Sequence, residues 1–334
     1  MLLGIVACGA EPAAAPAPED SAPAAEEAPA ELPKVAGKRG PKVTVDRSGP
    51  EPVVTAFGIQ LNDGEPPPDA WHWHEGDVML GGGPRMPMVH VPAATFTMGS
   101  GPFEEGRDAD EVAHEVTLSE YWIGATEVTR GQWRAVMGSD APDCYSACSD
   151  EHPVTRVSWD EAVAFTNTLS LRLGLRECQR QEFGSWVRDP GCDGIRLVTE
   201  AEWEHAARAG TTTPYSFGTR DELCANANGS DWWGRSCSDG HSDLAPVKSF
   251  PANAWGLYEM HGNAREWIWD WYGSYPTELV VDPMGPSFGS SRCLRGGSYE
   301  NEDRFLRSAF RDSIDPTVRT GNVGFRVARS APAR

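Results

Sequence analysis

The sequence predicts an α+β domain that is rich in loops and contains few helices and only short strands. Two stretches, 88–99 and 114–129, have the composition of short strands. Three positions further along combine a helix-capping hydroxyl with Glu or Gln three residues later. From Gly210 to Arg329 turn residues dominate, so we expect only short strands there.

The three capping positions predict the three helices of the domain. The pairs are Thr129 with Gln132, Ser158 with Glu161, and Thr199 with Glu202. We expect the helices that follow them to end near Met137, Arg172 and Ala209. The second and third helices carry apolar residues on one face, as helices that pack on a core do.

The amino terminus predicts export. Residues 1–8, MLLGIVAC, resemble a bacterial lipobox with Cys8 as the lipidated residue. A signal peptide has a basic start and 7–15 apolar residues, so this is a truncated lipoprotein-type signal segment or an accidental match. Residues 9–44 are mostly Ala, Pro, Glu and Ser, which predicts a disordered linker. Because no segment reaches the ~18 apolar residues of a membrane span, we expect membrane contact only through a lipid anchor at the bacterial cell envelope.

Residues 45–85 are expected to form an N-terminal extension that packs on the domain. Val53–Leu61 has the pattern of a strand. His72 and His74 alternate with Trp71 and Trp73, so both imidazoles would share one face of a strand. They are either two ligands of a metal site or a solvated pair beside a tryptophan.

Charge and cysteine content exclude some classes of function. The formal net charge is −20, from 29 basic and 49 acidic residues, which argues against a basic nucleic-acid-binding surface. Six of the eight cysteines fall in close pairs, which fits disulfides in an oxidising compartment. The pairs are Cys144 with Cys148, Cys178 with Cys192, and Cys224 with Cys237. Zinc is the competing interpretation, although the spacings form no paired C-x₂-C knuckles.

The stretch Asn253–Trp271, NAWGLYEMHGNAREWIWDW, carries four tryptophans and predicts one wall of the core. It resembles the GLYDM-GN-EW block of the formylglycine-generating, sulfatase-modifying enzyme family. Further blocks in the order of that family are FTMGS, EVTRGQW, PVTRVSWDEAVAF, IRLVTEAEWEHAARAG, PVKSFPANAWG, LRGGSY and VGFRV. The resemblance covers residues 86–330. It implies a C-type-lectin-like α+β fold with long loops, few helices and short antiparallel strands.

Members of that family are oxidoreductases in which two cysteines bind copper and carry the oxidation of a substrate cysteine. These cysteines lie three and eight residues beyond the serine of a Gly-Gly-Ser turn. Here the turn ends at Ser298, so the matching positions are Asn301 and Leu306. Because Cu(I) needs soft thiolate ligands, we expect neither copper nor the formylglycine reaction. Cys293 precedes the turn, and we expect it to point into the core.

A polar group remains around that turn. It consists of Ser298, Asn301, Glu302, Asp303, Arg304, Arg307 and Arg311. One interpretation is a pocket for a peptide or small anionic ligand, with arginine supplying bidentate contacts. The other is that Arg307 and Arg311 pair with acids and hold loops in place.

The resemblance also implies calcium. One family site maps to Asn263, the carbonyl of Ala264, and Glu266, whose oxygens suit Ca²⁺. The alternative is that Glu266 pairs with an arginine. A second site maps to Asn226 and Ala227, but the position of its aspartate holds Lys248.

Two functions therefore stay open. The chain is either a divergent oxidase or modifying enzyme of this family, or a non-catalytic lectin-like module for a peptide, glycan or envelope partner. Related iron enzymes bind their metal through an H-x₃-H-x-E motif, which the eight histidines do not form. Whether the chain binds iron through other residues is not decided by the sequence. We expect a monomer whose substrate or ligand is a peptide or protein.

Overall fold

A computed structural model of the chain describes residues 71–331, apart from 75, 145–147, 231–236 and 238–239, and three short strands before them. Those strands, β1 (Thr44–Asp46), β2 (Val53–Ala56) and β3 (Ile59–Gln60), form one antiparallel sheet. Val53–Leu61 is therefore two paired strands, not one. The chain divides into compact units at Gly64, and Cys8 lies outside the described residues.

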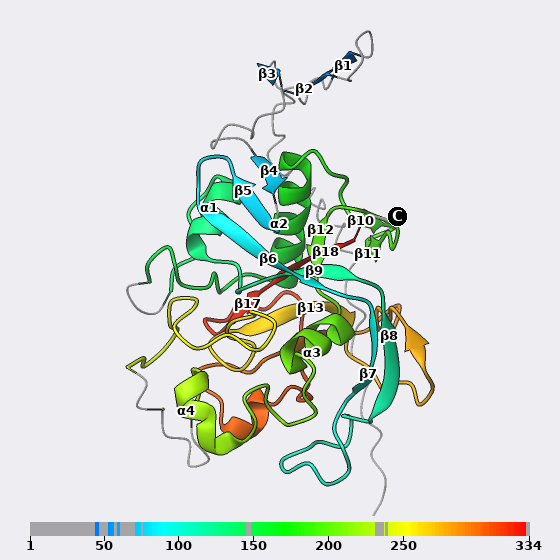
Figure 1. Cartoon of the computed structure of the whole chain (residues 1–334), viewed down its shortest axis with the longest axis vertical. Coiled ribbons are helices and arrows are strands. Elements are labelled where there is room, and N and C mark those ends of the chain that lie inside the picture. The colour runs from blue at the N-terminus through cyan, green and yellow to red at the C-terminus, as the bar shows by residue number, and fades with distance from the viewer. Residues whose placement is uncertain are drawn as a thin grey trace, which may run out of the picture. The chain divides into compact units, whose positions relative to one another are not determined.

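A six-stranded antiparallel sheet runs from the top to the middle of the larger unit in the view of Figure 1. Its order is β12 (Ile195–Leu197), β18 (Val327–Ser330), β9 (Tyr121–Gly124), β6 (Arg85–Val91), β5 (Asp77–Leu80) and β4 (Trp71–His74). The edge strand β4 brings Trp71 and Trp73 against the core. The indole of Trp73 meets Trp122 edge-on, with ring centroids 5.2 Å apart.

Two smaller sheets and a hairpin complete the β structure of the described residues. The four-stranded sheet has the order β16 (Asp312–Ile314), β15 (Arg292–Arg295), β13 (Arg265–Trp271) and β17 (Val323–Phe325). The three-stranded sheet has the order β14 (Val280–Val281), β8 (His114–Leu118) and β7 (Ala94–Met98). The hairpin joins β10 (Gln179–Glu182) to β11 (Ser185–Arg188). Most neighbouring strands are antiparallel, and β13 with β17 and β14 with β8 are parallel.

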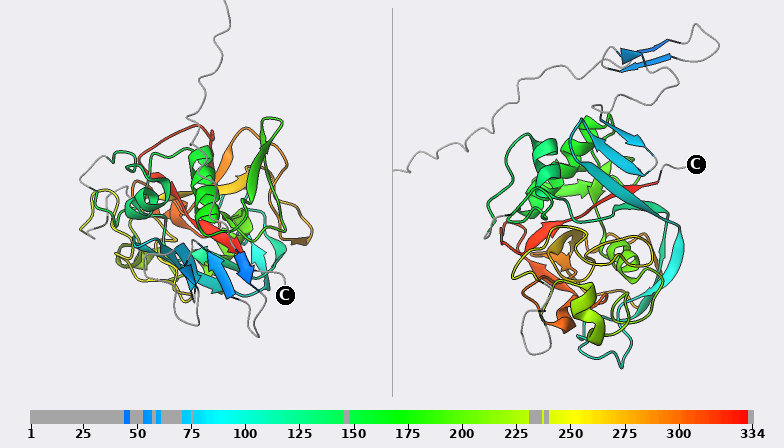
Figure 2. Two further views of the ribbon diagram at one scale, coloured as in Figure 1. Left: turned by 90° about the horizontal axis from the view of Figure 1, so that it is seen from above. Right: turned by 60° about the vertical axis from the view of Figure 1, so that its left-hand side comes forward.

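The helices begin where the capping pattern predicts. They are α1 (Arg130–Met137), α2 (Trp159–Arg172) and α3 (Glu200–Arg208), and each has a complete capping box. The short α4 (Leu223–Asn226) and the 3₁₀ turns η1 (Arg220–Glu222) and η2 (Asp303–Leu306) lie in the loops. In Figure 1 and on the right of Figure 2, α1 and α2 lie at the end of the larger unit near β4–β6, whereas α4 lies at the opposite end of that unit among long loops. None of the helices that the structure describes is long and apolar enough to cross a membrane.

The tryptophan-rich strand β13 forms a wall of the core, as the sequence predicts. Trp267 is fully buried and its indole N–H donates to the carbonyl of Val157 at 2.9 Å. Trp159 of α2 donates in the same way to Ile268 at 2.8 Å. These hydrogen bonds satisfy the indole donors that burial would otherwise leave without partners, and they tie α2 to β13.

Three disulfides close short loops. They join Cys144 to Cys148, Cys178 to Cys192, and Cys224 to Cys237, so the predicted pairing is confirmed. Cys293 is free and buried.

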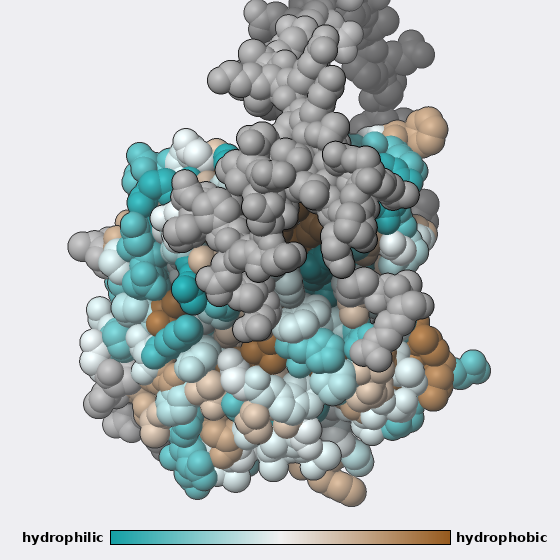
Figure 3. Space-filling view, turned by 45° about the horizontal axis from the view of Figure 1, so that its top comes forward, coloured by the Kyte–Doolittle hydropathy of each residue, from teal (hydrophilic) through white to brown (hydrophobic). Residues whose placement is uncertain are grey.

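On the face drawn in Figure 3, hydrophobic residues appear as small separate spots among hydrophilic ones.

Candidate functional site

The turn after β15 positions the first candidate residue, Ser298. Gly296 and Gly297 have φ angles of 92° and 68°, and a side chain at Gly297 would lie 2.6 Å from the carbonyl of Phe305. Glycine is therefore required for both the turn and the close approach. The backbone N–H and the hydroxyl of Ser298 both donate to Oδ1 of Asn301 at 2.9 Å.

Asn301 is held by these contacts, and its amide oxygen is fully occupied. Its Oδ1 accepts a third hydrogen bond, at 3.1 Å, from Nε of Arg265. Its backbone carbonyl accepts from Ser230 at 2.9 Å. Ser298 itself is fully buried. The pair therefore forms a closed structural turn and presents no free nucleophile or ligand.

The second position at which the resemblance implies copper is filled by a hydrocarbon side chain. Leu306 is fully buried against three glycines. A Cβ added at Gly229, Gly297 or Gly262 would lie 2.5, 2.9 or 3.0 Å from a methyl group of Leu306. Its isobutyl group thus occupies the space between these backbones. Because neither Asn301 nor Leu306 offers a thiolate, the residues present do not fit copper.

Arg307 and Arg311 bind acids and hold loops, which is the structural alternative stated above. Arg307 is 1 % exposed in its side chain and binds Glu111 through both terminal nitrogens at 2.6 and 2.8 Å. It also binds Glu104 at 2.6 Å. Arg311 binds the carboxylate of Glu200 at 2.8 and 3.0 Å. Neither guanidinium is free to meet a ligand.

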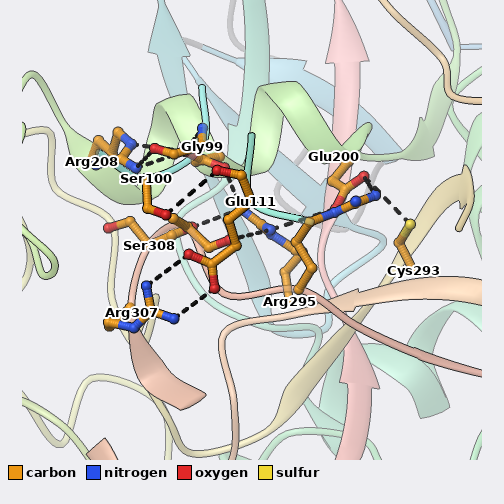
Figure 4. A network of polar contacts seen from close by, with 12 residues as sticks. Gly99, Ser100, Glu111, Glu200, Arg208, Cys293, Arg295, Arg307 and Ser308 are labelled. Carbon is orange, nitrogen blue, oxygen red and sulfur yellow. Dashed lines mark hydrogen bonds and ion pairs between the residues drawn. The ribbon is translucent and has the colours of Figure 1, made fainter. Parts of the chain in front are cut away.

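These pairs belong to a larger buried network that the sequence did not reveal (Figure 4). Glu200 and Glu204 project from α3 and bind Arg295 of β15, the latter at 2.6 Å. Burial alone would raise the pKa of Glu200, but Arg311 and Arg295 hold it below the usual value. The thiol of Cys293 lies 3.4 Å from Glu200. Burial and the neighbouring carboxylate of Glu200 raise the pKa of the Cys293 thiol well above its usual value. The thiol is therefore unsuited to metal binding or nucleophilic attack.

Arg304 is the one arginine of the predicted pocket that faces solvent. Its guanidinium lies 4.2 Å over the ring of Phe305 and has no ion pair within the described part of the chain. It lines a cavity of about 320 Å³ together with Arg307, Arg220, Tyr215 and Asp303. Glu302 is half-buried and, like Ser298 and Asn301, does not line this cavity.

The predicted calcium ligands are engaged by protein groups. Both oxygens of Glu266 contact the guanidinium of Arg326, at 2.9 and 3.1 Å, and the indole of Trp203 donates at 2.8 Å. Oδ1 of Asn263 accepts from Ala245 N at 2.9 Å and from Asn228 at 3.1 Å. Glu266 therefore has the arginine partner that was the alternative to calcium.

Two carboxylates that the sequence did not single out lie beside this cluster. Glu127 and Glu259 are buried, and each has one oxygen without a hydrogen-bond partner in the described structure. With Glu266 they place three carboxylates near the single guanidinium of Arg326. Burial and the neighbouring Glu259 raise the pKa of Glu127 well above its usual value, and burial raises that of Glu259 to about 7. Both groups therefore take up a proton more readily than an exposed glutamate does.

The residues of the second predicted calcium site make separate contacts with other protein groups. Asn226 ends α4 and donates to the carbonyl of Glu222 at 2.8 Å, and Ala227 is buried beside Leu306. Lys248 lies over the ring of Tyr258, 5.5 Å from its centroid. None of the described residues forms a cluster of three or more His, Cys, Asp or Glu side chains fit to hold a metal ion.

A separate cavity of about 520 Å³ is lined by Asp270, an aspartate with a strongly raised pKa. Asp270, at the end of β13, accepts a hydrogen bond from Glu200 N at 3.0 Å. Burial, together with the nearby charge of Glu200, raises the pKa of Asp270 to about 8. Trp271, Met98 and Arg311 line the same cavity. A carboxyl group with this pKa can donate or accept a proton near neutral pH.

Comparison with known proteins places this geometry in context. Residues 83–331 match the family model described as the sulfatase-modifying factor enzyme 1-like domain. A formylglycine-generating enzyme of Streptomyces coelicolor is 38 % identical, over 73 % of this chain and 89 % of that protein. The chaperone protein LppX of Paenibacillus barcinonensis is 30 % identical, over 64 % of this chain and 82 % of the relative. The solved structure of Treponema denticola variable protein 1 aligns with a TM-score of 0.65 and 32 % identity, over 74 % of this chain and 96 % of that one.

Proposed function

We propose a function for a chain that belongs to the sulfatase-modifying factor enzyme 1-like family: it is an exported binding module that keeps this fold without the copper chemistry. The family membership and the fold predicted from the sequence are both confirmed. The ligand we propose is an acidic peptide, or another anionic group, of a partner at the cell envelope.

The packing around Leu306 is the observation that carries this proposal. The leucine fills the space between Gly229, Gly262 and Gly297, and Asn301 closes the turn above it. Restoring a copper site would need two thiols where the buried isobutyl group of Leu306 and the fully bonded amide oxygen of Asn301 now lie. The oxidation of a substrate cysteine has no residue to carry it at these positions.

Arg304 supports binding of an anionic group. Its exposed guanidinium stacks on Phe305 and borders the 320 Å³ cavity. A guanidinium that no carboxylate neutralises can form a bidentate pair with an incoming carboxylate. The ring of Tyr215 in the same cavity offers an apolar surface, since its hydroxyl already donates to the carbonyl of Asp303.

Export to the bacterial cell envelope as a lipoprotein is part of the proposal. The three disulfides support an oxidising compartment, and the relative named LppX supports it further. Lipidation would fall on Cys8, ahead of the linker formed by residues 9–44.

A divergent modifying enzyme is the second candidate, and Asp270 favours it. This carboxyl group has a pKa of about 8 and lies in a cavity of about 520 Å³. A buried acid that titrates near neutral pH is a common feature of active sites. A structural calcium ion at Asn263 and Glu266 is the alternative to the ion pair in which Arg326 contacts both oxygens of Glu266.

Copper-loading and activity assays test the main proposal. The purified chain is incubated with Cu(I), oxygen and a C-x-P-x-R peptide, and the peptide is read by mass spectrometry. We expect no aldehyde product and no more bound copper than in Cys293→Ala, which lacks the free thiol of the described residues. We also expect acidic peptides to bind more weakly to Arg304→Ala. Turnover to the aldehyde, or stoichiometric copper or iron in the isolated protein, would overturn the proposal in favour of an enzyme.

A further inference from the structure

A third cavity, of about 580 Å³, is lined by an arginine with two guanidinium nitrogens that lack a hydrogen-bond partner among the described residues. Arg188, the last residue of β11, lines it together with residues of β12, the start of α3 and the segment 282–284. Nε and Nη1 of Arg188 are buried, and neither has a hydrogen-bond partner within the described residues. This cavity shares no lining residue with the one beside Arg304.

Three other charged groups of the cavity already have partners. Arg196 binds both oxygens of Glu202 at 2.6 and 2.7 Å. The carboxylate of Asp282 accepts from the backbone N–H and the hydroxyl of Ser119, both at 2.7 Å. Two further acids line the cavity: Glu120 contacts His90 at 3.2 Å, and Asp193 lies 3.6 Å from Arg176, with its Oδ1 lacking a hydrogen bond. Within the described residues, none of these four acids forms an ion pair with Arg188.

An unpartnered, buried guanidinium is costly. A buried donor without a partner costs on the order of 1–3 kcal/mol, and more when the group is charged. Burial and the neighbouring Arg196 lower the pKa of Arg188 to about 9, so it still carries its charge at neutral pH. Arginine cannot relieve this cost by losing its proton there, so a negative group from solution is the natural partner.

We propose that this cavity binds the carboxylate of a small organic acid, with Arg188 as the residue that pairs with it. Its planar donors match the two oxygens of a carboxylate. The remaining walls include the apolar side chains of Leu118, Pro190, Pro283 and Met284, which suit the hydrocarbon part of such a ligand. The volume also exceeds what a bare inorganic ion needs.

Calorimetry on the full chain tests this site with N-acetyl-leucine as the probe and its neutral amide as the matched ligand. We expect the acid to bind the wild type at least tenfold more tightly than the amide does. Arg188→Gln should lose this preference. Arg180→Gln on the same hairpin should keep it, because Arg180 pairs with Glu182 on the exposed side of β10. Acid binding should weaken above pH 9, where Arg188 loses its charge.

Three outcomes would overturn the proposal. The first is equal affinity for the acid and the amide in the wild type, a comparison that needs no variant to fold. The second is unchanged acid binding by Arg188→Gln when circular dichroism shows that the variant is folded. The third is equal affinity for inorganic phosphate and N-acetyl-leucine, which would mean that the apolar walls contribute nothing and that only a bare anion is held.

Discussion

Replacing Glu266 by Gln should destabilise the fold by about 3–5 kcal/mol, the range for removing one partner of a buried ion pair. Glu266 and Arg326 are both fully buried, and three contacts of 2.9–3.1 Å join them. Arg326 cannot swing to water, because it also donates to the carbonyls of Gly124 and Tyr258 at 2.8 Å. The substitution therefore leaves a buried positive charge with its main partner removed.

Urea denaturation of metal-stripped protein, followed by tryptophan fluorescence, measures this loss. Glu182→Gln is the matched control, since it breaks the exposed pair between Glu182 and Arg180. Pairs of that kind contribute roughly 0–1 kcal/mol. A loss at Glu266 no larger than at Glu182 would refute the reasoning.

The same titration separates the ion pair from calcium. Because Arg326 and Trp203 occupy the oxygens of Glu266, we expect the free energy of unfolding to stay constant as calcium is added. A ligand specific to the native state would instead add about 2.7 kcal/mol at a hundredfold excess over Kd. A rise of that size in the wild type, lost in Glu266→Gln, would establish the calcium site and refute the ion pair as the main partner.

Two more predictions follow from buried groups. Asp270 has a folded pKa of about 8 against an ordinary value of 3.8, so the stability it contributes is complete below pH 4 and is lost as the pH rises to 8. Unfolding free energies across this range should therefore fall less steeply for Asp270→Asn than for the wild type, by up to about 1.4 kcal/mol per pH unit; parallel curves would contradict the raised pKa. Non-reducing peptide maps should show the crosslinks 144–148, 178–192 and 224–237, with Cys293 alkylated only after unfolding; crosslinks between different pairs, or a reactive Cys293 in the native chain, would contradict the structure.

Features that depend on neighbouring residues were predictable from the sequence. A capping box involves residues three apart, so Thr129, Ser158 and Thr199 marked the three helix starts correctly. The disulfides were predictable for the same reason, because each closes a loop of at most 14 residues.

Charge partners depend on contacts between distant residues, and the sequence left these undecided. Glu266 could be read as a calcium ligand or as a partner of an arginine, and its partner lies 60 residues away. The partner of Arg307 is Glu111, 196 residues away. The cavity containing Arg188 has walls from several distant segments, so no local pattern could have revealed it.

The buried charges also explain why the family blocks persist in a chain without copper ligands. Glu266 lies in the GN-EW block and Arg326 in VGFRV, and together they join β13 to the strand region at the end of the chain. Glu200 of the IRLVTEAEW block binds Arg311 and Arg295, the latter next to the Gly-Gly-Ser turn. One partner of a buried ion pair thus lies in each of four blocks: GN-EW, VGFRV, IRLVTEAEW and LRGGSY. Because removing one partner is far more costly than never having had the pair, these residues are constrained by folding whether or not the chain catalyses a reaction. The blocks therefore identify the fold, whereas the copper reaction must be argued from residues 301 and 306.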